Sequence, residues 1–303
     1  MKTYIPAKFK YFKRKIHSNW NNTWRDISNR NVVITNNPIF ILGNQKSGTS
    51  AVAALLSELT NVSVCIDLRK EVWSPSYHEV LEGKITFARF VERNHVDFSK
   101  DIIKEPNLTF LHHDLFELFP SSKVVFIVRD PRSNIKSILN RLSIPGSLDS
   151  LTKEYRSTLP YAWKLILDNR GLDVKTDNKN SYIEALAYRW NFASNVLTKY
   201  LQVEACTSCN LTRRSGRYFL IRYEDFINDK VGELEKLAYG LELEPVNDIS
   251  EKVNVQFQPR GENHVDWKRK DTNWKDFFGT NNLTKIETIC QSNMEKFGYQ
   301  ISS

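Results

Sequence analysis

The chain has 303 residues, of which 41 % are hydrophobic and 26 % charged, and it carries a formal net charge of +8. These values are ordinary for a soluble globular protein, and the length allows one large α/β domain or two smaller ones. No run of about 18 apolar residues occurs, so the sequence predicts no transmembrane helix. Because the N-terminus also lacks the apolar stretch of a signal peptide, we expect a cytoplasmic protein.

Most of the positive charge lies in the first 30 residues, which hold eight basic side chains against one acidic side chain, Asp26. Aromatic residues alternate with the basic ones, and Asn36-Asn37-Pro38 separates this segment from the rest. Residues 1–36 are therefore interpreted as a basic aromatic arm. The arm is either a solvated tail or a peripheral contact with anionic lipid. No nucleic-acid-binding motif appears, so we expect no nucleic-acid partner.

Apolar runs typical of buried strands alternate with segments of helical spacing along the rest of the chain. The predicted strands are 39–42, 62–66, 102–103, 124–128 and 218–221, and the predicted helices are 49–59, 111–119, 133–142, 182–201, 231–241 and 283–297. This alternation predicts a single α/β domain over residues 37–303, with a central, mostly parallel sheet flanked by helices. Residues 143–180 are irregular, and we interpret them as a partly helical cap over a substrate.

The loop Gly43–Ser50, with the sequence GNQKSGTS, joins the first predicted strand to the first predicted helix. Glycines let backbone N–H groups turn inward, the helix N-terminus adds partial positive charge, and Lys46 adds a full charge. Further donors are the hydroxyl groups of Ser47, Thr49 and Ser50. Gly43 and Gly48 have the spacing of a P-loop, but Thr49 stands where nucleotide triphosphatases have lysine. The sequence therefore predicts a P-loop-like anion cradle with its lysine inside the loop.

A second anion site is predicted where the strand 124–128 ends. Arg129 follows this strand directly and offers a fork of donors. Ser137 lies eight residues later on the next predicted helix, where it can face the same point. The two side chains are a candidate clamp for a single phosphate, in addition to the loop at residues 43–50.

KSGTS after an apolar strand resembles the 5′-phosphosulfate loop of sulfotransferases that use the nucleotide donor PAPS. VVFIVRDPRSNIKSILNR resembles the 3′-phosphate motif of the same family, FLIRYEDF its RYEDL element, and MEKFGY its ending, so the resemblance spans residues 38–299. It implies a P-loop-like fold and the nucleotide-binding residues Gly43, Gln45, Lys46, Ser47, Gly48, Thr49, Ser50, Arg129 and Ser137. Lys268, Arg269 and Lys270 resemble the basic loop that closes over the nucleotide.

An acceptor hydroxyl loses a proton as it attacks sulfur, so the reaction needs a base. In the sequence from the first loop to Lys104 and its neighbour, the candidates are Asp67, Glu71, His78, Glu79, His95 and Glu105. KEVWSPSY resembles the heparan-type glycan sulfotransferases, which implies Glu71 as the base and leaves Asp67 open. Phenol-type members use a histidine, for which His78 and His95 are the choices. Lys104 resembles a second active-site lysine of the glycan-modifying branch. The resemblance therefore implies Lys46, Glu71 and Lys104 as catalytic residues.

The resulting hypothesis is in-line sulfuryl transfer from PAPS, which leaves the product PAP, to a hydroxyl or amine by a transferase of the EC 2.8.2 type. We expect no metal, and we expect a carbohydrate or glycolipid acceptor; a small alcohol, a phenol or a protein tyrosine remains open.

The alternative functions are a P-loop nucleotide kinase, which predicts lysine after Gly48, and a binding module that uses the basic arm. Cys206 and Cys209 form a single CxxC, which we interpret as two loop thiols rather than a zinc site.

Overall fold

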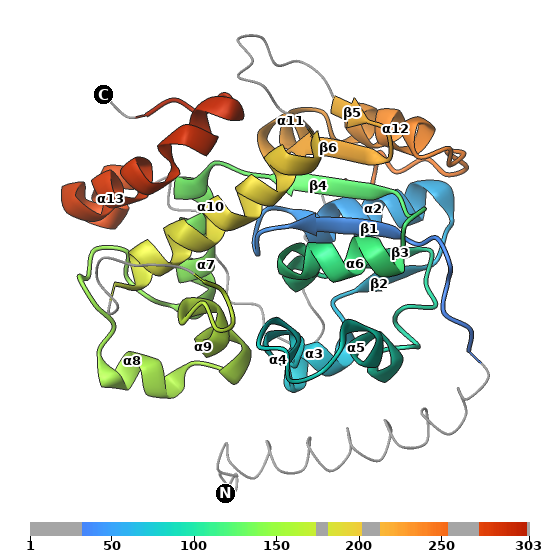
Figure 1. Cartoon of the computed structure of the whole chain (residues 1–303). Helices are drawn as coiled ribbons and strands as arrows, with labels where there is room; N and C mark the ends of the chain where they lie inside the picture. The colour runs from blue at the N-terminus through green and yellow to red at the C-terminus, as the bar shows by residue number, and fades with distance from the viewer. Residues whose placement is uncertain (1–31, 174–180, 202–212, 254–272, 302–303) are drawn as a thin grey trace, which may run out of the picture.

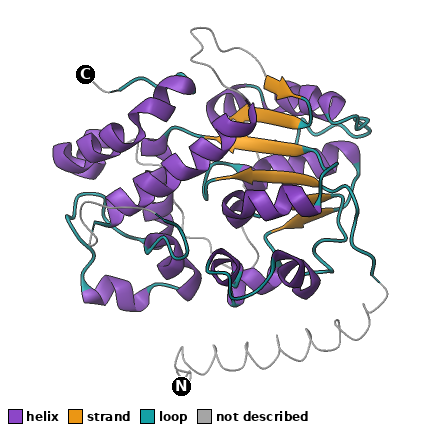
Figure 2. Ribbon diagram, in the orientation of Figure 1, coloured by secondary structure: helices purple, strands orange, loops and turns teal. Residues whose placement is uncertain are grey.

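A mostly parallel β-sheet forms the centre of the protein (Figure 1 and Figure 2). The computed structural model describes residues 32–173, 181–201, 213–253 and 273–301. Within these ranges the sheet has six strands in the order β2-β3-β1-β4-β6-β5, and neighbours pair in parallel except β5 and β6. The strands are β1 (Ile39–Gly43), β2 (Val64–Ile66), β3 (Ile102–Lys104), β4 (Val124–Val128), β5 (Arg213–Ser215) and β6 (Tyr218–Arg222).

The central strands β1 and β4 are buried at every position. Side chains of a strand point alternately to the two faces of its sheet, so strands with no polar position require cover on both faces. The register pairs Phe40 with Val124 and Gly43 with Ile127. The carboxyl ends of β1 and β4 therefore lie side by side, at the sheet edge where ligands bind in parallel α/β folds.

Helices bury a separate hydrophobic core on each face of the sheet. On one face, α2 (Thr49–Thr60) and α12 (Lys230–Gly240) pack their leucines against the strands. The other face is covered by α6 (His112–Leu118), α7 (Pro131–Leu142), α10 (Tyr182–Leu201) and α13 (Trp274–Lys296). In Figure 1, α10 crosses the front of the sheet diagonally and contacts α13 beside it.

Short helices surround the carboxyl edge of β2 and β3. They are α3 (Arg69–Trp73), α4 (Tyr77–Leu81), α5 (Phe87–Arg93) and the 3₁₀ helix η1 (Pro106–Leu111). The segment predicted as a cap contains α8 (Lys153–Thr158) and α9 (Tyr161–Leu167), and α11 (Tyr223–Asn228) follows β6. α9 packs against α3 and α10, so the cap segment lies beside the elements that follow β2 (Figure 1).

The predicted fold class is confirmed: the protein is α/β, with a mostly parallel sheet flanked by helices. The largest boundary difference is in α13, which begins at Trp274 rather than at residue 283. Gly279 interrupts it with φ 70° and ψ 165°, and this break hid the first part from the helical pattern. Residues 1–31 of the arm lie outside the described residues. Within the described ranges, no helix combines the length and apolar character needed to cross a bilayer.

Candidate functional site

The residues that the sequence predicts to carry chemistry follow the carboxyl ends of four neighbouring strands. Lys46 follows β1, Asp67 follows β2, Lys104 ends β3, and Arg129 follows β4. Tyr223 adds an aromatic ring after β6, the next strand in the sheet. Because these strands run in parallel, all five residues lie along one edge of the sheet, which is the candidate site.

Two glycines allow the loop after β1 to pass close to its neighbours. Gly43 has φ 143°, and a Cβ there would collide with the carbonyl oxygen of Ile127 on β4. Gly48 has φ 98°, and a Cβ there would lie 2.5 Å from the ring of Tyr223. The Thr109 hydroxyl accepts from the Gly43 N–H at 2.9 Å and lies 3.1 Å from its carbonyl oxygen. The glycine spacing thus reflects close packing at both ends of the loop.

Asn134 on α7 holds the middle of the loop from outside. Its Nδ2 donates to the carbonyl oxygen of Gln45 at 2.8 Å and to the hydroxyl of Ser47 at 3.0 Å. Its Oδ1 accepts from Asn44 Nδ2 at 2.9 Å. Lys46, which follows Gln45 in the loop, is exposed and has a left-handed backbone with φ 66°. The loop is therefore a fixed turn that presents one lysine to solvent.

The helix after the loop begins without a side-chain cap. Gly48 is the N-cap residue of α2 and has no side chain to cap it, while its carbonyl oxygen accepts from the N–H groups of Ala51 and Val52. The first N–H groups of a helix have no partner within the helix, and its N-terminus carries partial positive charge. Thr49 is buried and Ser50 is partly exposed at this point. The loop and helix start together have the donors that a phosphate needs.

Arg129 connects the second predicted anion site to the first. Its Nη1 donates to the carbonyl oxygen of Lys46 at 3.0 Å, and its guanidinium lies 4.2 Å from the centroid of the Tyr223 ring. The Arg129 carbonyl oxygen accepts from Nε1 of Trp190 at 2.9 Å. The two anion motifs are therefore in direct contact, although 83 positions separate Arg129 from Lys46. Ser137 is partly exposed on α7, and its role in a clamp stays a prediction.

Glu71 is buried and holds the start of α4. One carboxylate oxygen accepts from the N–H groups of Ser76 at 2.6 Å and Tyr77 at 3.0 Å, and the other accepts from the Ser76 hydroxyl at 2.7 Å. Burial raises the pKa of Glu71, and these hydrogen bonds act against that rise. Both oxygens thus have a local structural use, while the catalytic role of Glu71 stays a prediction.

Asp67 and Lys104 form an ion pair at the ends of β2 and β3. The Lys104 side chain is 5 % exposed, whereas that of Asp67 is 24 % exposed, so the carboxylate is the member that a substrate can reach. The neighbouring Glu105 is buried and accepts from the N–H groups of Leu68 at 3.3 Å and Asn107 at 2.9 Å. Burial, and then the charge of Asp67, raise the pKa of Glu105 to about 7, and Lys104 opposes that rise.

The two histidines considered as alternative bases do not belong to the group of residues at the strand ends. His78 is buried on α4 with its ring edge toward Tyr161 of α9, and His95 Nδ1 lies 3.1 Å from the carbonyl oxygen of Glu92 in the same turn. Lys268, Arg269 and Lys270, with Cys206 and Cys209, lie outside the described residues. Among the residues that are described, no group of three or more His, Cys, Asp or Glu side chains could hold a metal ion.

A sulfotransferase domain model matches residues 36–298 of the chain, which is most of its length. The chain belongs to the sulfotransferase family. Curated proteins give no significant match to it. Membership makes this protein a transferase of sulfuryl groups, and the family uses PAPS as the donor.

The chain is similar to solved sulfotransferases at low sequence identity. Mouse sulfotransferase SULT7A1 complexed with PAP is 16 % identical with a TM-score of 0.50, over 86 % of each chain. The sulfotransferase of Alicyclobacillus acidocaldarius is 15 % identical with a TM-score of 0.43, over 84 % of this chain and 96 % of that one. STF9 of Mycobacterium avium is 10 % identical with a TM-score of 0.48, over 94 % and 82 %.

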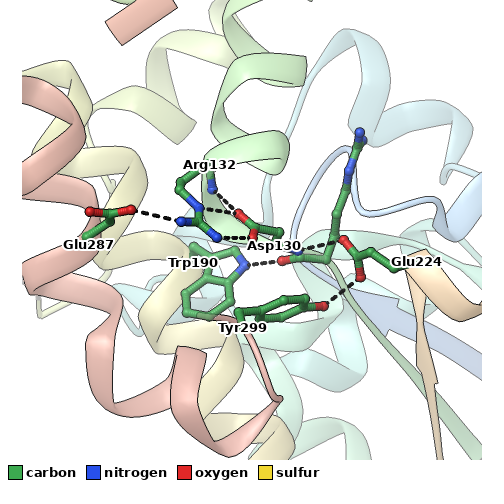
Figure 3. Close-up of polar contacts among 7 residues, drawn as sticks. Asp130, Arg132, Trp190, Glu224, Glu287 and Tyr299 are labelled. Carbon is green, nitrogen blue, oxygen red and sulfur yellow. Dashed lines mark hydrogen bonds and ion pairs between the residues drawn. The ribbon is translucent and has the colours of Figure 1, made fainter. Parts of the chain in front are cut away.

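The sequence did not indicate a polar cluster behind Arg129 of this sulfotransferase (Figure 3). Arg132 is 4 % exposed and pairs with Asp130 at 2.6 Å and with Glu287 of α13 at 2.8 Å. Its guanidinium also lies 3.8 Å from the ring centroid of Trp274, the first residue of α13. The cluster therefore ties α13 to the segment that carries Arg129, and no local sequence pattern joins residues 155 positions apart.

Glu224 supports the same segment from the other side. Its carboxylate accepts from the Asp130 N–H at 3.0 Å and from the Tyr299 hydroxyl at 2.8 Å (Figure 3). Burial and the nearby Glu224 carboxylate raise the pKa of Tyr299, so its hydroxyl keeps its proton and donates. The RYED element at the end of β6 thus supplies both the ring beside Arg129, Tyr223, and the acceptor behind it.

Proposed function

We propose that this protein transfers the sulfuryl group of PAPS to a hydroxyl or amine of a carbohydrate or glycolipid, leaving PAP. The observation that carries the proposal is the hydrogen bond from Arg129 Nη1 to the carbonyl oxygen of Lys46. Through this bond the guanidinium of Arg129 lies beside the anion loop that carries Lys46. PAPS has phosphate groups at its 3′ and 5′ positions, so its binding requires two such groups of cationic side chains. A kinase site would instead need lysine after the second glycine and side chains that hold Mg²⁺, including an acid at a strand end.

Charge stabilisation is the main task of these residues in the proposed reaction. Lys46 is exposed at the tip of the loop and neutralises charge on the bridging oxygen of the leaving phosphate. The uncapped start of α2 holds the 5′-phosphate through N–H groups, and Arg129 with Ser137 holds the 3′-phosphate. In-line transfer then requires an acceptor held opposite Lys46.

Asp67 is the preferred base in this proposal. It lies at the same sheet edge as Lys46, keeps 24 % of its side chain exposed, and is oriented by Lys104. Glu71, which the sequence resemblance implies, binds three donors around the start of α4. A base must be within hydrogen-bond reach of the acceptor, which favours the more accessible carboxylate.

Exposed aromatic rings support an acceptor with apolar faces, such as a sugar ring or a glycolipid. Trp73 on α3 is 79 % exposed and Tyr161 on α9 is 57 % exposed, and α9 packs against α3, which begins two residues after Asp67. Exposed apolar groups gathered beside a site mark a binding surface. A phenol or a protein tyrosine would contact the same rings, so transfer assays must distinguish these acceptors from a carbohydrate. The basic arm, residues 1–36, would supply a peripheral membrane contact for a lipid-bound acceptor.

Two measurements test the function. The purified full chain is expected to bind PAP in the presence of EDTA, whereas binding of ATP only with Mg²⁺ would support the kinase alternative. Transfer from radiolabelled PAPS is then measured against a panel of glycans, glycolipids, small alcohols, phenols and tyrosine peptides. Lys46→Ala should lower the rate about a hundredfold or more while the melting temperature is retained. Transfer at the wild-type rate by that variant would overturn the proposed role of the loop.

A further inference from the structure

A buried arginine lies directly behind the candidate site. Arg189 on α10 has no exposed side-chain surface and makes no ion pair with any carboxylate that the structure describes. Its guanidinium lies 3.9 Å from the ring centroid of Phe110 on η1. Burial lowers its pKa, and Tyr77 and Glu105 act against that change. Burial of a cation without a carboxylate partner costs free energy, so other polar groups must stabilise Arg189.

Arg189 instead binds two amide side chains at the sheet edge. Its Nε donates to Oε1 of Gln45 at 3.1 Å, and its Nη2 donates to Oδ1 of Asn107 at 3.0 Å. Gln45 Nε2 completes the ring of contacts by donating to the same Asn107 oxygen at 2.7 Å. Gln45 precedes Lys46 in the anion loop, and Asn107 follows Lys104 by three residues. The ring therefore joins the anion loop, next to Lys46, to the segment that follows β3.

The ring leaves one orientation for the Asn107 amide. A guanidinium has five N–H donors and no acceptor, so both amides must turn their oxygens toward Arg189. The Asn107 oxygen then receives two donors, and its nitrogen must point away from Gln45 and Arg189. Asn107 is partly exposed, and its Nδ2 has no hydrogen-bond partner among the described residues and is not buried. An N–H donor held in a fixed orientation is thus accessible to solvent next to the residue pair that contacts the anion loop.

We propose that Asn107 Nδ2 donates to an oxygen of the sulfuryl group, and that Arg189 is the positioning residue that fixes this donor. The inference rests on the proposed function. The anionic oxygens of that group are acceptors for a preoriented donor beside the anion loop, and a donor fixed beforehand needs no reorganisation during transfer. The network also gives the buried arginine a use that lysine could not fill, because the rotatable donors of an ammonium group lack the rigid fork that holds both amides.

Binding of PAP and PAPS to the full chain without acceptor tests this inference, because the two nucleotides differ by the sulfuryl group. Wild-type binding of both nucleotides tests the proposed function, and the variant-to-wild-type ratio of their dissociation constants tests Asn107. Asn107→Ala should raise the dissociation constant of PAPS about tenfold and leave that of PAP within twofold. Asn107→Asp keeps an oxygen for Gln45 and Arg189 but replaces the outward donor by a charged carboxylate oxygen, so PAPS affinity should fall further than in Asn107→Ala, and by more than PAP affinity.

Control variants separate this role from a structural one. Asn282→Ala removes a buried amide that donates to the carbonyl oxygens of Gly146 and Leu148, and it should leave the ratio of PAPS to PAP affinity unchanged. Arg189→Lys should reproduce the selective loss of Asn107→Ala. Equal weakening of PAP and PAPS by the Asn107 variants would make the network a support for the loop alone and overturn the inference. Unchanged PAPS affinity with a raised acceptor KM would overturn it too, since Asn107 would then contact the acceptor.

Discussion

The guanidinium of Arg129 lies over the ring of Tyr223, 4.2 Å from its centroid, and Gly48 lies so close to the same ring that a Cβ there would collide with it. Tyr223 thus contacts the residue predicted to bind the 3′-phosphate and the loop predicted to bind the 5′-phosphate. The Arg129–Lys46 hydrogen bond adds a second link between the same two segments. The spacing of the two anion sites is therefore set by one aromatic ring and one carbonyl group.

Replacement of Tyr223 tests this spacing. Tyr223→Ala should raise the dissociation constant of PAP about fivefold, because a cation–π contact contributes about 1 kcal/mol at a partly exposed site. Tyr223→Phe is the matched control, since it keeps the ring and should bind PAP within twofold of wild type. Titration calorimetry of both variants provides the measurement. Equal affinity of the two variants would show that the ring does not orient Arg129.

The choice between two carboxylates as the base has a direct test. Asp67→Asn should lower kcat by about 10² or more, since general base catalysis contributes about 10²–10⁴. Its amide oxygen still accepts from Lys104, so the fold should be retained. Glu71→Gln should instead lower the melting temperature, because an amide has one acceptor oxygen where Ser76 and Tyr77 use two. A large loss of kcat in Glu71→Gln with full activity in Asp67→Asn would restore Glu71 as the base.

The strands and long helices were predictable because each is specified by a continuous local pattern. β4 is five apolar residues in sequence, and α10, Tyr182–Leu201, has the bounds that its helical spacing predicts. The short elements were not predictable, because their stability comes from polar contacts within a mixed sequence. α4 starts where Glu71 binds the N–H groups of Ser76 and Tyr77, and α5 starts where Thr86 accepts from the Arg89 N–H.

The candidate site divides in the same way. The glycine spacing and the lysine of residues 43–50 are local, so the loop was predictable from the sequence. The ring formed by Gln45, Asn107 and Arg189 was not, because its contacts join residues 62, 82 and 144 positions apart. In the sequence, Arg189 is a charged residue within a predicted helix, and charged residues of helices are usually exposed. It is buried because α10 packs against the sheet.

The ion pair between Arg132 and Glu287 should stabilise α13. Glu287→Ala leaves a guanidinium that is 4 % exposed with one carboxylate fewer, so the free energy of unfolding should fall by about 3 kcal/mol. Glu295→Ala, at an exposed position of the same helix, should change it by less than about 0.5 kcal/mol. Urea unfolding at neutral pH measures both values. A Glu287 variant as stable as the Glu295 variant would argue against the cluster as the anchor of α13.

The buried carboxyl group of Glu105 should make the stability of the protein depend on pH. Burial and the charge of Asp67 raise its pKa from 4.5 to about 7, so the folded state binds the proton more tightly than the unfolded state. This contribution is fully present below about pH 4.5 and is lost as the pH rises through about 7. The wild-type free energy of unfolding should therefore contain a component that falls between pH 5 and pH 8.

Glu105→Gln removes the titrating group and should flatten that fall, so the variant gains stability relative to wild type as the pH rises. Urea unfolding at pH 5, 6, 7 and 8 measures the two slopes, and Glu117→Gln on the exposed side of α6 serves as a control that should follow wild type. Parallel curves for Glu105→Gln and wild type would mean that Glu105 stays ionised in the folded state. Lys104 would then lie beside two ionised carboxylates, Asp67 and Glu105, instead of one.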